Sequence, residues 1–151
     1  DLHYPLRRQR QMCIRDRRLM FQARDAKITL SVEGEAAVIN GVRQVLYEML
    51  FNLCDNAIKY NQPGGSVRVS ILKKQDGKAE IKVQDNGIGI APEHQERVFE
   101  RFYRVDKSHS RETGGTGLGL SIVKHGALLH NAKLTLESAP GKGTGITILF
   151  P

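Results

Sequence analysis

Two short glycine-rich segments constrain this chain more than any other feature. Asp85-Asn86-Gly87-Ile88-Gly89-Ile90 ends a run in which apolar and polar residues alternate, and Gly115-Thr116-Gly117-Leu118-Gly119-Leu120 begins an apolar run with helical spacing. Glycine lets the backbone pass close to a ligand and adopt φ > 0. A helix that begins in such a loop directs its free N–H groups and its dipole at an anion. With one carboxylate, the two loops predict a nucleotide pocket.

The composition is that of a globular protein with a core. The 151 residues are 40% hydrophobic and 26% charged, which argues against wholesale disorder. No apolar run approaches the roughly 20 residues that a membrane helix needs, and no signal-peptide pattern is present. Cys13 and Cys54 form neither a disulfide framework nor a metal-ligand pattern.

The formal net charge of +7 raises the alternative of a basic nucleic-acid binder. Much of the excess comes from arginines within residues 1–18, and the remaining basic residues are interleaved with acids. Basic side chains around a triphosphate explain that remainder equally well. We therefore expect no nucleic-acid partner.

The hydrophobic pattern predicts one two-layer α/β domain over residues 25–151. Residues 1–24 are expected to be a linker, the remnant of a preceding helical segment, or non-native sequence. Strands are expected around 28–32, 38–39, 67–71, 81–83, 134–136 and 146–150, and helices over 41–61, 92–99 and 117–130.

The predicted helix over 41–61 carries a polar face beside its apolar stripe. Several side chains fall within about 80° of arc on that face: Glu48, Asn52, Asn56 and Lys59. One interpretation is a solvated surface. The other is a polar wall for a metal–phosphate group, because amide oxygens can ligate Mg²⁺ and a lysine can bind a phosphate.

Asp85 follows an alternating strand and precedes a glycine turn. It is either a turn aspartate or a carboxylate that accepts a hydrogen bond from a purine amine, with Gly87 and Gly89 letting the base approach. The loop 114–120 is neither a P-loop nor a dinucleotide-binding turn, because no Gly-Lys-[Ser/Thr] follows and no strand precedes it. The amides of 115–119 either begin a helix or cradle phosphates.

The segment Phe99-Glu100-Arg101-Phe102-Tyr103-Arg104 combines aromatic and basic residues. Phe99 and Phe102 could pack and tether a loop, while Arg101 and Arg104 either serve the structure or reach a phosphate. Residues 101–116 are polar and basic without periodicity, and we expect a mobile loop there.

In this order, these segments resemble the ATP-binding domain of sensor histidine kinases. They are similar to that family's N, G1, F and G2 boxes: Asn52-Leu53-Cys54-Asp55-Asn56-Ala57-Ile58-Lys59-Tyr60, residues 85–90, residues 99–104 and residues 115–120. Gly141-Lys142-Gly143-Thr144 resembles the last glycine box. The resemblance covers about 25–151, and the stretch from Val105-Asp106-Lys107 to Lys124-His125 is similar to the phosphate-sensing type.

The resemblance implies a Bergerat fold, an α/β (α+β) two-layer sandwich with about three helices on one face of a mixed, mainly antiparallel five-stranded sheet. It implies a site for ATP and Mg²⁺ in which Asn52 ligates the metal, while Asn56, Lys59 and Arg104 contact phosphate. Tyr60 would lie along the nucleoside, Asp85 would bind adenine N6, and Thr144 would support it through water. The remaining site residues that it implies are Gly87, Gly89, Ile90, Arg101, Phe102, Gly115, Thr116, Gly117, Leu118, Gly119 and Leu120.

The resemblance also separates phosphoryl transfer from hydrolysis. Hydrolytic relatives carry a water-activating glutamate at the position of Asn52, and an amide cannot take a proton from water. Glu48 lies one turn away and is a poorer substitute. His3 does not match the family's acceptor-histidine setting, so we expect a catalytic domain that needs a separate phosphoacceptor hairpin.

The sequence thus predicts a monomeric, cytoplasmic Mg²⁺·ATP-dependent histidine kinase domain. Its parent is expected to be anchored in the bacterial inner membrane and to signal to a response regulator. Three alternatives stay open: a degenerate module that binds nucleotide or protein without transfer, an ATP-hydrolysing relative, and a basic nucleic-acid binder.

Overall fold

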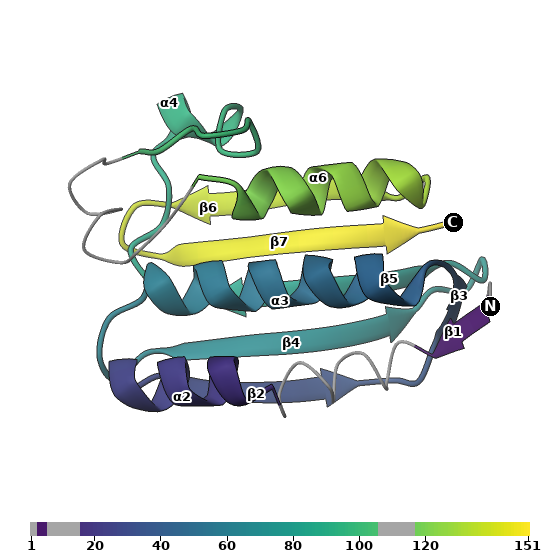
Figure 1. The fold of residues 1–151 in the computed structure, drawn as a ribbon, viewed down its shortest axis with the longest axis horizontal. Helices are drawn as coiled ribbons and strands as arrows, with labels where there is room; N and C mark the ends of the chain where they lie inside the picture. The colour runs from purple at the N-terminus through teal and green to yellow at the C-terminus, as the bar shows by residue number, and fades with distance from the viewer. Residues whose placement is uncertain (1–2, 6–15, 106–116) are drawn as a thin grey trace.

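The computed structural model describes residues 3–5, 16–105 and 117–151, and residues 3–5 by their backbone alone (Figure 1). The helices are α2 (Arg17–Ala26), α3 (Arg43–Lys59), α4 (Pro92–Gln95) and α6 (Gly119–Leu129). The strands are β1 (His3–Pro5), β2 (Thr29–Gly34), β3 (Val38–Asn40), β4 (Ser66–Lys73), β5 (Ala79–Asp85), β6 (Lys133–Ala139) and β7 (Gly143–Phe150).

The main sheet has five strands in the order β2-β4-β5-β7-β6. The outer pair β2 and β4 is parallel, and the other neighbouring pairs are antiparallel. Helices α2, α3 and α6 lie over one face of this sheet (Figure 1). The predicted two-layer fold with a mixed, mainly antiparallel sheet is therefore confirmed. The expected strand around 38–39 exists as β3, but it pairs with β1 in a separate two-stranded sheet.

The buried faces of the strands and of α3 form one hydrophobic core between the helix and the sheet. Alternate residues of β5 are buried, from Ala79 through Ile81 and Val83 to Asp85. In the apolar stripe of α3, four residues are at most 2% exposed: Leu46, Met49, Leu50 and Leu53. Side chains of strand and helix thus fill the space between the layers, as the two periodicities predict.

Helix α2 belongs to this core, although its apolar spacing is poor in the sequence. Leu19 and Ala23 are buried among the core residues. Asp16 begins the helix, because its side chain accepts a hydrogen bond of 2.8 Å from the backbone N–H of Arg18. A division of the chain at residues 24 and 25 stays a prediction, and α2 spans that point.

The helices are shorter than predicted. The largest difference is at α4, which ends at Gln95 instead of continuing to residue 99. Beyond it, one hydrogen bond of the α-helical type runs from Val98 N to His94 O, and further bonds join residues three apart, from Arg97 N to His94 O and from Glu100 N to Arg97 O. Bonds between residues three apart tighten the chain into successive turns and do not extend an α-helix. No helix in the described part of the chain is long and apolar enough to span a membrane.

Truncation of a core residue of α3 tests this packing. Leu50 is 1% exposed, so Leu50→Ala should lower the free energy of unfolding by about 2–5 kcal/mol through lost burial and the cavity it leaves. Leu128→Ala is the matched control, because Leu128 is 65% exposed and surface changes usually stay within about 0.5 kcal/mol. Urea denaturation measures both. Equal losses in the two variants would contradict the described core.

Candidate functional site

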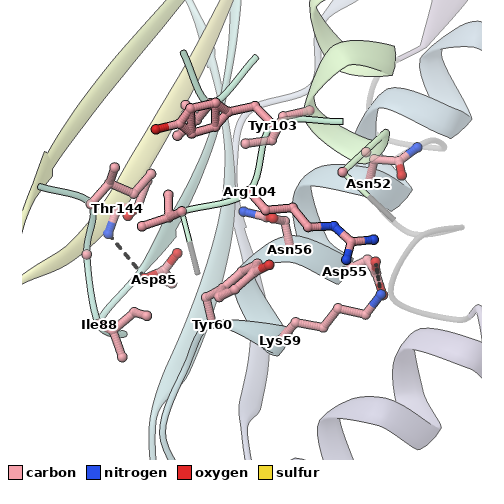
Figure 2. A pocket seen from close by; sticks show the side chains of 17 residues that line it. Asn52, Asp55, Asn56, Lys59, Tyr60, Asp85, Ile88, Tyr103, Arg104 and Thr144 are labelled. Atoms are coloured by element: carbon pink, nitrogen blue, oxygen red, sulfur yellow. Dashed lines mark hydrogen bonds and ion pairs between the residues drawn. The ribbon is translucent and has the colours of Figure 1, made fainter. Parts of the chain in front are cut away.

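A cavity of about 420 Å³ lies where α3, the 85–90 corner, the start of α6 and the segment 98–105 meet. Its volume falls in the range of small-molecule and cofactor sites. Figure 2 shows its side chains, with Asp85 and Thr144 on one side and Lys59, Asp55 and Arg104 on the other.

Most of the predicted site residues line this cavity: Asn52, Asn56, Lys59, Tyr60, Asp85, Gly89, Ile90, Arg104, Gly117, Gly119, Leu120 and Thr144. Four predicted residues are not part of the lining: Gly87, Arg101, Phe102 and Leu118. Gly115 and Thr116 lie outside the described residues.

The lining also contains residues that the sequence prediction did not select: Asp55, Ile88, Val98, Tyr103 and Val105. Helical spacing could have indicated Asp55, since it lies three residues after Asn52 and four before Lys59. No comparable sequence signal marks Tyr103 or Val105, which reach the cavity because the turns after α4 return toward α3.

Asp85 is 8% exposed at the end of β5, where the alternation of the strand directs its side chain toward the core. Its Oδ1 accepts hydrogen bonds from the backbone N–H of Gly87, at 2.9 Å, and of Thr144, at 3.1 Å. Figure 2 shows the bond from Thr144. Within the described residues, Oδ2 receives no hydrogen bond. The carboxylate is thus fixed by one oxygen and offers the other.

Burial raises the pKa of Asp85, and the two backbone hydrogen bonds oppose that rise. A largely buried carboxylate with one unpaired oxygen is a costly arrangement for stability. Carboxyl groups with a perturbed pKa inside a cavity are more typical of ligand-binding sites than of turns. The geometry therefore favours the binding interpretation over the simple turn aspartate.

The corner that carries Asp85 is held from two sides. Ile88 N donates to Tyr60 O at 3.1 Å, which ties the corner to the end of α3, and Gly141 N donates to Ile88 O at 2.8 Å. Gly89 has φ +74°, and a Cβ there would lie 2.0 Å from Ala139 O. Only glycine fits this approach between the corner and the β6–β7 turn.

At the other end of the cavity, α3 presents amides and charges. Asn52 Nδ2 donates to Glu48 O at 2.7 Å, and within the described residues its Oδ1 makes no hydrogen bond. Lys59 Nζ lies 3.0 Å from an oxygen of Asp55, one helical turn away. Arg104 extends toward this same end (Figure 2). The site thus offers a free amide oxygen beside two cationic side chains.

The described start of the expected 101–116 loop is hydrogen-bonded to the residue that follows the loop. Phe102 N donates to Gly117 O at 2.8 Å, and Phe102 itself has φ +63°, an uncommon conformation for a bulky residue. Its ring is 64% exposed, with the Arg101 guanidinium 5.3 Å from its centre. Phe99, in contrast, packs against the core.

Tyr103, next to Phe102 in the chain, is held by two side chains. Its hydroxyl group hydrogen-bonds to His94 Nδ1, and the Arg97 guanidinium lies 4.5 Å from the centre of its ring. These contacts join the wall of the cavity next to Arg104 to α4.

Comparison with known proteins assigns the chain to a family. The family model described as "Histidine kinase-, DNA gyrase B-, and HSP90-like ATPase" matches residues 41–151. The sensor-like histidine kinase SenX3 of Mycolicibacterium smegmatis is 46% identical over 130 residues, which cover 85% of this chain and 34% of SenX3. The phosphate regulon sensor protein PhoR of Pseudomonas aeruginosa is 42% identical over 135 residues, which cover 89% of this chain and 30% of PhoR.

A solved structure of the mycobacterial sensor histidine kinase MprB superposes on this fold with a TM-score of 0.83 at 30% identity, covering 99% of this chain and 95% of that one. The chain therefore belongs to the histidine kinase-, DNA gyrase B- and HSP90-like ATPase family. Within that family it is similar to the catalytic ATP-binding domains of sensor histidine kinases, which confirms the resemblance seen in the sequence. It spans about a third of the length of SenX3 and PhoR.

The environment of Asp85 predicts a pH-dependent effect of Asp85→Asn on stability. The amide keeps an acceptor for Gly87 and Thr144 and removes the buried charge. Because the folded-state pKa is raised, the ionised group destabilises the fold above that pKa, and the penalty disappears as the pH falls toward the ordinary value of 3.8.

At pH 7 the variant should therefore melt at the wild-type temperature or up to about 4 °C higher. The difference should shrink on acidification. Thermal denaturation followed by circular dichroism at several pH values measures both. A variant that is several degrees less stable at pH 7 would contradict the described environment of this carboxyl group.

Proposed function

We propose that this chain binds ATP with Mg²⁺ and donates the γ-phosphoryl group to a histidine on a separate phosphoacceptor hairpin. The observation that carries the proposal is the polarity of the cavity. A buried carboxylate with a free oxygen stands at one end, and Lys59, Arg104 and amide side chains stand at the other. This matches an adenine at the first end and a triphosphate at the second.

At the base end, Asp85 Oδ2 would accept a hydrogen bond from the exocyclic amine of adenine. Thr144, 7% exposed, would support that contact through water. Ile90 and Leu120 supply apolar walls, and Tyr60 would lie along the nucleoside. Gly89 lets the 85–90 corner pack closely against the β6–β7 turn. Gly87 does not line the cavity, but its backbone N–H donates a hydrogen bond to Asp85.

At the phosphate end, Asn56, Lys59 and Arg104 would contact the phosphates, helped by the backbone around Gly117 and Gly119. Lys59 is paired with Asp55 at 3.0 Å, so a phosphate would replace or share that partner. Arg101, Phe102 and Leu118 are not part of the lining, and Gly115 and Thr116 are not described. We keep all five as proposed nucleotide-binding residues. Arg101, Phe102, Gly115 and Thr116 belong to the proposed lid over about 101–116, which would close over the nucleotide.

Mg²⁺ fits the residues that are present. Its preferred ligands are oxygens, and the free Oδ1 of Asn52 is an amide oxygen whose orientation is fixed by the bond from Nδ2 to Glu48 O. Asn52 would hold the ion against the phosphates. When bound, the ion would neutralise phosphate charge during transfer.

Transfer needs little proton chemistry from this chain. A neutral imidazole nitrogen of the acceptor attacks the γ-phosphorus, a phosphorus–nitrogen bond forms, and the bond to the ADP oxygen breaks. Lys59 and Arg104 would stabilise the charge on the transferring group, so catalysis rests on positioning and electrostatics.

The arrangement of α3 supports transfer over hydrolysis. Asn52 stands in the lining and cannot act as a general base. Glu48 is exposed, is not part of the lining, and accepts a hydrogen bond of 3.4 Å from Gln44. The chain thus offers no carboxylate at the position from which hydrolytic relatives are expected to activate water.

The proposal extends to the parent protein. The similarity to SenX3 supports a sensor histidine kinase, and the similarity to the phosphate regulon sensor protein PhoR supports one of the phosphate-sensing type. Such a parent would be anchored in the bacterial inner membrane, with this domain cytoplasmic, monomeric in isolation, and linked to a response regulator through the phosphorylated hairpin. We propose no nucleic-acid partner.

Binding of ATP with and without Mg²⁺ tests the base end of the site. Asp85→Asn should weaken binding by about 1–3 kcal/mol, because the amide places a donor or a weaker acceptor where the amine needs a carboxylate. Isothermal titration calorimetry measures this. Asp76→Asn is the matched control, since Asp76 lies exposed in the β4–β5 turn. A wild-type chain that binds no ATP would overturn the proposed function.

Asn52→Ala tests the metal end. It should lower Mg²⁺-dependent transfer to a supplied phosphoacceptor hairpin by about tenfold or more, while ATP affinity changes less. Radiolabel transfer and calorimetry measure the two effects. Gln44→Ala, which removes an exposed amide from the same helix, should leave both unchanged. Intact transfer in Asn52→Ala would contradict the metal assignment.

A further inference from the structure

Ser138 of β6 stands at the base end of the cavity without being part of its lining. Its Oγ is 2.8 Å from Ile90 N, 2.9 Å from Gly143 O and 2.9 Å from Thr144 Oγ1. Gln95 Nε2 donates to both Ile90 O, at 2.8 Å, and Ser138 O, at 3.0 Å. The Ser138 hydroxyl group is therefore held by three hydrogen-bond partners, and the Ser138 backbone is held in turn by Gln95.

The directions of these hydrogen bonds follow from counting protons. A serine hydroxyl group has one proton and can accept two hydrogen bonds. Gly143 O can only accept, so the Ser138 proton points to it. Ile90 N–H can only donate, so it occupies one acceptor position of Oγ.

The remaining contact is with the Thr144 hydroxyl group, which must then donate to Ser138. With its own proton used in this way, Thr144 Oγ1 keeps only lone pairs for the cavity. Asp85, when ionised, also offers only acceptors, because a carboxylate carries no proton. Its Oδ1 accepts from two backbone N–H groups, and its Oδ2 remains as an acceptor for the ligand. The Asp85 and Thr144 side chains at the base end of the cavity thus accept hydrogen bonds and do not donate them.

We infer that Ser138 is a specificity-determining positioning residue, which turns the Thr144 hydroxyl group into an obligate acceptor and so selects a purine with an amino group at position 6 over one with an oxo group. The inference rests on the proposed nucleotide-binding function. An amino group can donate to Asp85, and also to a water whose two protons are taken by the Asp85 and Thr144 acceptors. An oxo group brings lone pairs against the lone pairs of Asp85 and of that water, which has no proton left to give, and this is unfavourable in a desolvated site.

The test compares Mg²⁺·ATP with Mg²⁺·ITP, which carries an oxo group in place of the amino group, by calorimetry on the full chain. Wild type should bind ATP more tightly than ITP. Ser138→Ala frees the Thr144 proton to turn toward the cavity, so the ratio of the two dissociation constants should fall by about three- to tenfold. Most of the fall should come from relatively better ITP binding.

Three variants separate this role from a merely structural one. Ser138→Thr retains the hydroxyl group and should keep the wild-type ratio, and Ser70→Ala, which removes a half-buried serine on the opposite face of the sheet, should keep it too. If Ser138→Ala does not fold, Ser138→Cys, which has a similar shape and a much weaker acceptor, carries the same expectation. An unchanged ratio in a folded variant would overturn the inference. A wild-type chain that binds neither nucleotide would instead overturn the proposed function.

Discussion

The placement of one buried carboxylate organises the site. The alternation that buries Ile81 and Val83 also buries Asp85, so the core of the sheet and the base end of the cavity are set by the same strand. Backbone N–H groups from the 85–90 corner and from β7 hold one oxygen and leave the other available. The fold therefore carries an electrostatic penalty at this position, and a ligand with a suitably placed donor can relieve it.

The rest of the cavity follows from the position of α3 over the sheet. One face of the helix carries the apolar stripe into the core, and the adjacent strip of amides and charges faces the cavity. The same helix thus anchors the domain and supplies Asn52 and Lys59 at the end opposite Asp85. The contact between Phe102 and Gly117 sets where the expected lid leaves and rejoins this wall.

Period-two strands, a long amphipathic helix and glycine corners are local signals, and they predicted the layers of the fold. Most of the lining was predicted from these signals together with the resemblance to sensor histidine kinases. The sequence did not predict the packing of α2. Leu19 and Ala23 are buried only through contact with the rest of the core, which the local sequence pattern does not show. Tyr103 enters the cavity through successive tight turns, and Phe102 points out through a positive φ. Those directions depend on tertiary contacts with α4 and Gly117 that no periodicity encodes.

A crystal structure of this chain with Mg²⁺ and a non-hydrolysable ATP analogue tests the central claim most directly. The account predicts the adenine amine within hydrogen-bond distance of Asp85 Oδ2, the metal on Asn52 Oδ1, and the phosphates near Lys59 and Arg104. A nucleotide bound elsewhere, or one bound with its base at the α3 end and its phosphates at Asp85, would contradict it.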